Sequence, residues 1–174
     1  LDALVPAALL GGDAEDAQAC GRALGALVRA CGAAALAEHG APCILAALSE
    51  AEEAAAEPPP QESLDAAVAV AQAGIVGVPA HRKASVQAAE LLFRRARPEH
   101  LQAHAMRSAG PLVRALAEKS EDAELQASIL AALETLLLEA RAQLRPLVPV
   151  LQTNLLKLLE GPNGEPRAAA ARAL

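Results

Sequence analysis

The chain has 174 residues, of which 53% are hydrophobic and only 1% aromatic, and its formal net charge is −6. Its apolar residues are mainly alanine and leucine, which favour helices, whereas strands are enriched in aromatic and β-branched residues. The composition therefore excludes a β-sandwich or barrel and predicts an all-α fold. The acidic balance and the near absence of stacking rings argue against nucleic-acid binding by the chain as a whole.

The cysteines and the hydropathy pattern bear on location. Cys20, Cys31 and Cys43 are odd in number and contain no CxxC pair, so we expect reduced thiols packed in the core of a cytoplasmic protein. The longest uncharged run, 66–80, is shorter than the roughly 20 residues of a membrane-spanning helix. We therefore expect no membrane partner.

Apolar residues recur at helical spacing in short blocks along the chain. The first block ends at a glycine pair, and Asp13 is a suitable N-cap for the second, which runs to Cys31. The remaining helices are predicted at 36–48, 64–76, 80–97, 99–117, 122–140 and 144–160, with a first helix at 4–10 and a last, incomplete one from 165.

An acidic, proline-broken loop is predicted at about 50–62, where AEEAAAE is followed by three prolines. A helical partner for 36–48 would be expected there, and the sequence leaves open whether one exists. The most economical interpretation of the acidic run is a solvated loop, with a partner-binding segment as the alternative.

The blocks repeat. The triplet Pro111-Leu112-Val113 recurs as Pro149-Val150-Leu151, 38 residues later, and Ala132-Leu133 recurs as Ala173-Leu174, 41 residues later. A period near 40 in helix pairs is typical of HEAT and armadillo repeats. We predict a single HEAT/armadillo-type α-solenoid of about four to five helix pairs over residues 1–174, with both ends truncated from a longer chain.

One stretch carries a family resemblance. The segment 108–174 contains GPLVR at 110–114, LRPLVPVLQT at 144–153, then Lys157, Pro162-Asn163 and Arg167. In order and spacing, from about Leu64, it resembles the carboxy-terminal HEAT region of the general control non-derepressible translational activator family. The resemblance implies a scaffold that binds ribosomes and activates the kinase of the initiation factor two alpha subunit, by contacting the kinase's RWD-type domain.

Catalytic and metal-binding patterns were weighed against this scaffold. His100 and His104 are four residues apart on one predicted helix, but the HLQAH string lacks the glutamate of a zinc protease motif and a third ligand. No nucleophile elbow accompanies the serines. We therefore expect no catalytic residue, metal, cofactor or small-molecule substrate, and a protein that is not an enzyme.

Basic residues gather around the predicted helix 80–97. Val86, Ala89, Leu92 and Phe93 follow helical spacing and are expected to be buried, which would turn the arginines toward solvent. The arginines near the helix end also fit a stabilising role at its C-terminus. The candidate partner-binding residues are Arg82, Lys83, Arg94, Arg95, Arg97, Arg114 and Arg167.

Two functional interpretations stay open. The first is the translational-control scaffold whose partners are ribosomes and the kinase's RWD-type domain. The alternative is another HEAT adaptor, such as a nuclear transport receptor, a phosphatase scaffold or a cullin regulator, because repeat architecture alone does not fix function.

Overall fold

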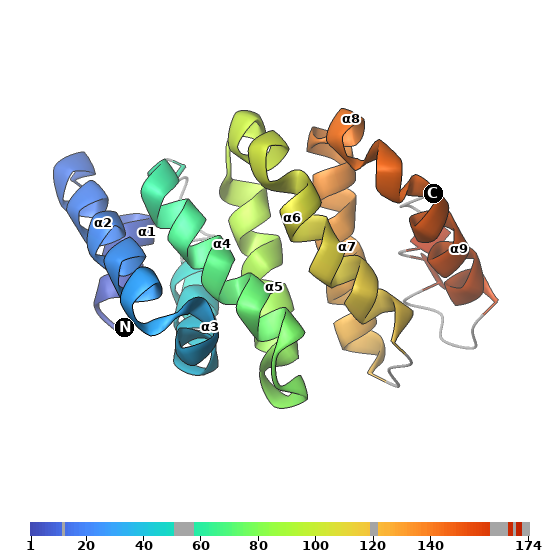
Figure 1. Cartoon of the computed structure of the whole chain (residues 1–174), viewed down its shortest axis with the longest axis horizontal. Coiled ribbons are helices and arrows are strands. Elements are labelled where there is room, and N and C mark those ends of the chain that lie inside the picture. The colour runs from blue at the N-terminus through green and yellow to red at the C-terminus, as the bar shows by residue number, and fades with distance from the viewer. Residues whose placement is uncertain (12, 51–57, 119–121, 161–166, 169, 172–174) are drawn as a thin grey trace. The chain divides into compact units, whose positions relative to one another are not determined.

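A computed structural model describes the chain except residues 12, 51–57, 119–121, 161–166, 169 and 172–174. Within the described residues the regular structure is entirely helical, which confirms the all-α prediction. Its elements are α1 (Leu4–Leu10), α2 (Ala14–Cys31), α3 (Ala33–Glu50), α4 (Gln61–Val76), α5 (Pro79–Arg95), α6 (Pro98–Ala117), α7 (Ala123–Glu139), α8 (Arg141–Leu144), the 3-10 helix η1 (Arg145–Leu147) and α9 (Val148–Leu159) (Figure 1).

The helices form two compact units, Leu1–Arg97 and Pro98–Leu174. The first unit contains α1 to α5, and the second contains α6 to α9. Each unit has its own buried apolar residues.

Helix α2 shows how the sequence sets the bounds of an element. The Asp13 carboxylate accepts a hydrogen bond from the Glu15 amide at 2.8 Å, which satisfies a backbone donor at the helix start. The helix ends where Gly32 takes a φ of +82°, a conformation that glycine adopts without steric cost. Both bounds match the sequence prediction.

The first unit is built from consecutive helix pairs that lie against each other. Helix α4 packs beside α2, α5 packs beside α3, and α4 also contacts α3 and α5 (Figure 1). Within the described part of the chain, α3 contacts α1, α2, α4 and α5.

Close approach between these helices depends on small residues. A Cβ atom on Gly21 of α2 would lie 3.0 Å from the Ser63 amide nitrogen of α4, and a Cβ on Gly74 of α4 would lie 2.9 Å from the Ser85 Cβ of α5. Both serines are fully buried, and their hydroxyls donate to the carbonyls of Ala17 and His81. Larger residues at these glycines would push the helices apart.

Helix α5 buries the predicted apolar set. The exposed fractions of Val86, Ala89, Leu92 and Phe93 are 0%, 1%, 0% and 2%, so this prediction is confirmed. The helix ends at Arg95 rather than at the predicted Arg97. Pro98 disfavours helical conformation at the residue before it, and the backbone is already extended at Ala96.

The second unit packs α6 against α7 and against the shorter helices that follow. Its core is rich in leucine, with Leu112, Leu130, Leu133 and Leu136 all essentially inaccessible to solvent. Helix α7 begins after Asp122, whose carboxylate accepts from the Leu125 amide at 3.0 Å.

The predicted single helix at 144–160 is wrong. The structure divides it into the end of α8, the 3-10 turn η1 and α9. Pro146 and Pro149 have no N–H to donate, and their rings clash with the preceding turn of an α-helix, so both lie within the first two positions of a new element. The motif 144–153 therefore runs through a bend between two helices.

The predicted acidic loop at 50–62 is too long at its C-terminal end. Pro60 has an extended backbone and precedes α4, so Gln61 and Glu62 form the first turn of that helix. An acidic side chain there is favourable beside the helix dipole. The acidic residues within 51–57 and the start of the predicted helix from 165 lie outside the described residues, although Arg167 is helical.

Candidate functional site

Within the first unit, the predicted basic residues lie toward both ends of α5. Arg82 and Lys83 lie in the first turns of α5, while Arg94 and Arg95 lie in its last turn. Twelve residues separate Arg82 from Arg94, which is about 18 Å along a helix at 1.5 Å per residue. Arg114 and Arg167 belong to the second unit, where both are exposed.

Arg82 and Arg94 of α5 both make contacts with other residues of the chain. The Arg82 side chain is half-buried, and its Nε donates to the carbonyl oxygen of Ile75 at 3.0 Å, near the C-terminus of α4. The Arg94 guanidinium is 2.7 Å from the Glu90 carboxylate one turn earlier. Arg82 therefore differs from its predicted solvent-facing position, because it caps a neighbouring helix end.

The rest of the basic set varies in exposure. Lys83 and Arg95 are half-buried, whereas Arg97 is exposed beyond the end of α5. His81 lies at the other end of the same helix, where its Nε2 is 3.9 Å from a Glu38 carboxylate oxygen on α3. Arg97 is thus the member of the set in the first unit that is best placed to contact a partner.

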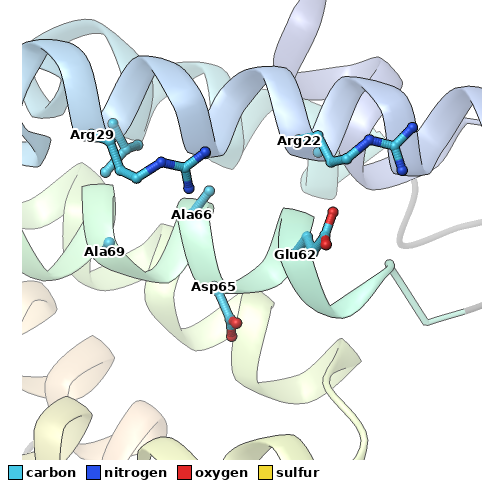
Figure 2. A pocket seen from close by; sticks show the side chains of 9 residues that line it. Arg22, Arg29, Glu62, Asp65, Ala66 and Ala69 are labelled. Atoms are coloured by element: carbon cyan, nitrogen blue, oxygen red, sulfur yellow. The ribbon is translucent and has the colours of Figure 1, made fainter.

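A groove between α2 and α4 was not anticipated from the sequence. It has a volume of about 410 Å³, and its lining residues are Gly21, Arg22, Gly25, Val28, Arg29, Glu62, Asp65, Ala66 and Ala69. Figure 2 shows α2 along one side, carrying the two arginines, and α4 along the other, with Glu62 below Arg22 and Ala66 below Arg29.

One sequence signal does point to this groove. Arg22 and Arg29 are the only arginines or lysines among the first 81 residues, and they are seven residues apart on one helix. Gly21 and Gly25 lie next to them in the helical pattern. An isolated pair of cations next to glycines, on an otherwise acidic segment, indicates a possible binding surface on this helix.

The cysteines are less buried than the sequence predicted. Cys31 is exposed at the end of α2, and Cys20 and Cys43 are half-buried, so the expected core packing is wrong. Burial raises the pKa of the Cys43 thiol, and its hydrogen bond to the Asp2 carboxylate, at 3.0 Å, raises it further. This thiol links the N-terminus to α3 and is held in its protonated form.

His100 and His104 both lie half-buried on α6. Within the residues that the structure describes, no three His, Cys, Asp or Glu side chains gather as a metal ion would require. None of the described helices combines the length and the apolarity that a membrane span needs.

Comparisons with known proteins add no family. No protein-family model, no curated protein and no solved structure matches this chain.

Proposed function

We propose that this chain is a non-enzymatic protein-binding scaffold built as a HEAT-type α-solenoid. The observation that carries the proposal is the register of the first unit, in which α4 lies beside α2 and α5 beside α3. Stacking each helix on its equivalent in the next pair is how solenoid repeats share a continuous core. Such stacks present long helical surfaces to macromolecular partners, and their function resides in those surfaces.

We further propose a role in translational control, in the cytoplasm, with ribosomes and the RWD-type domain of the initiation-factor kinase as partners. The support is the resemblance of 144–153 to the general control non-derepressible activator family. Side chains that would carry recognition there, including Arg145, Gln152 and Thr153, are exposed, while Leu144 and Leu151 are buried. The motif thus combines a structural part with a part that a partner can reach.

The basic residues supply the test. Arg97→Glu and Arg114→Glu reverse exposed charges in the first and second units, and exposed substitutions usually change stability by no more than about 0.5 kcal/mol. Arg94 is a poorer choice, because a glutamate there would lie one turn from Glu90. The matched control is Arg141→Glu, an exposed charge reversal on α8.

The experiment is a pull-down of the kinase's RWD-type domain and, separately, of ribosomes by each variant of the full chain. We expect the wild type and the Arg141 variant to retain a partner, and the Arg97 or Arg114 variant to lose it, because opposing like charges at an interface costs several kcal/mol. Equal retention by every variant would remove these arginines from the interface. Retention of neither partner by the wild type would reject the translational role and favour another HEAT adaptor function.

A further inference from the structure

The groove between α2 and α4 has the dimensions of a peptide site. It extends along α2 from Arg22 to Arg29, seven residues, or about 10 Å at 1.5 Å per residue. That is the length of about three residues of an extended chain at 3.3 Å each. The volume of about 410 Å³ falls within the usual range for ligand-binding clefts, roughly 300–1,000 Å³.

Small residues create this groove. Gly21 allows α4 to approach α2 at one end, since a Cβ there would meet the Ser63 backbone. At Gly25 a Cβ would instead meet the Arg29 Nη1, at 3.4 Å. The Arg29 side chain therefore extends back along α2 over Gly25, and Figure 2 shows its guanidinium reaching toward Ala66.

The charges of the groove are unevenly distributed. At one end, Glu62 on α4 lies opposite Arg22 on α2, so the negative charge of one wall offsets the positive charge of the other. At the other end, Arg29 faces Ala66 and Ala69. Neither a hydrogen bond nor an ion pair joins the Arg29 guanidinium to another residue in the described part of the chain. This end is a cation above an apolar floor.

We propose that the groove binds a short peptide segment of a partner protein, in which one Asp or Glu is flanked by alanine-sized residues. The carboxylate pairs with the Arg29 guanidinium, whose planar fork suits two parallel hydrogen bonds. The neighbouring small side chains lie over Gly25, Ala66 and Ala69, which line the same groove.

The acidic residues on the α4 side of the groove favour a peptide over a nucleic acid as the ligand. A phosphate backbone is bound by several cations together, and here Glu62 and Asp65 line the same groove as the two arginines. A single carboxylate needs only Arg29 and avoids the acidic end. This site lies on α2 and α4, so it does not depend on the proposed role of the arginines at α5 and α6.

The test is a titration of the 174-residue chain with acetyl-Ala-Glu-Ala-Ala-amide, followed through the backbone amide signals in ¹⁵N–¹H spectra. We expect shifts at Gly25, Arg29, Ala66 and Ala69. The peptide with Gln in place of Glu, and the Arg29→Gln protein with the original peptide, should each bind about fivefold more weakly, which corresponds to ~1 kcal/mol for one exposed ion pair. The matched control protein, Arg141→Gln, should bind like the wild type.

A second variant guards against an effect of Arg29→Gln on the end of α2. Gly25→Leu fills the groove from a position where the backbone has room, so it should abolish the amide shifts while circular dichroism stays unchanged. Equal affinity for the Glu and Gln peptides would overturn the proposal. So would shifts confined to other helices, an absence of shifts at millimolar peptide, or stronger shifts of the same amides with single-stranded RNA.

Discussion

Helices α4 and α7 are both covered by neighbouring helices of their own unit, yet they bury different kinds of residue. Half of the buried residues of α4 are small, among them Ser63, Ala67, Ala71 and Gly74, and the other half are larger side chains such as Leu64. The buried face of α7 is formed by leucine and isoleucine, with one alanine, and its members are Leu125, Ile129, Leu130, Ala132, Leu133 and Leu136.

The difference indicates two ways of packing helices within one chain. In the first unit, missing side chains let backbones approach, so stability depends on keeping positions such as Gly21 and Gly74 empty. In the second unit, large side chains fill the space between helices, so stability depends on their volume. Protein interiors are close-packed, and both arrangements should therefore be sensitive to substitution, but in opposite directions.

The largest effect is expected from removing volume in the second unit. Leu133 is 1% exposed, and Leu133→Ala should lower the free energy of unfolding by about 2–5 kcal/mol, through lost burial and the cavity left behind. Urea unfolding measures the loss of free energy, and amide hydrogen exchange shows which helices are destabilised. Faster exchange in α6 and α7 is expected, and an unchanged unfolding midpoint would contradict this account of the second unit.

A smaller loss is expected from adding volume in the first unit. The Cβ introduced by Gly74→Ala would lie 2.9 Å from the Ser85 Cβ, so α4 and α5 must shift. Overpacking of this kind costs about 1–3 kcal/mol, and the better helix propensity of alanine returns up to ~1 kcal/mol of it. Urea unfolding should therefore show a net destabilisation.

A substitution at Ser85 provides the control for Gly74→Ala. Ser85→Gly removes the atom that the new Cβ meets, so the double variant Gly74→Ala/Ser85→Gly should be more stable than the sum of the single effects predicts. Strict additivity in the double-mutant cycle would show that the two helices do not meet at this point.

The sequence predicted most helix positions because their signals are local. Asp13 and Gly32 set the ends of α2 through a side-chain cap and a left-handed glycine, and both effects act within a few residues. The break at 145–147 was missed because proline is compatible with the first turn of a helix. The leucine pattern on either side of Pro146 therefore read as one continuous helix.

The candidate sites were less predictable, since they depend on contacts between helices. Nothing near Arg82 in the sequence shows that its guanidinium reaches the Ile75 carbonyl on another helix. The Glu90–Arg94 pair, by contrast, joins residues four apart on one helix and could have been predicted from their spacing. The groove at Arg29 exists only because α4 lies beside α2, which hydrophobic periodicity does not specify.

Substitutions of the two N-cap residues test whether the two units unfold separately. Asp13→Ala removes the acceptor for the Glu15 amide and should cost about 1 kcal/mol, as N-cap losses typically do. Hydrogen exchange should accelerate in α2, within the first unit, while α7 keeps its protection. Asp122→Ala should give the converse pattern. Equal loss of protection in both helices from either variant would mean that the units unfold as one.

The smallest predicted effect is at the one helical glycine of α6. Apart from its chain neighbours, a Cβ on Gly110 would have no atom within 4 Å, in contrast to Gly74, whose Cβ would meet Ser85. Gly110→Ala should change the stability of the second unit by less than about 1 kcal/mol, because the better helix propensity of alanine is offset by the contact of its Cβ with the ring of Pro111, the next residue in α6. The measurement is the urea midpoint beside that of Gly74→Ala. The same substitution should then be nearly neutral in the unit packed by large side chains and lower stability in the unit packed by close backbone approach. A loss at Gly110 as large as that at Gly74 would show that the glycines of the two units are not distinguished by packing.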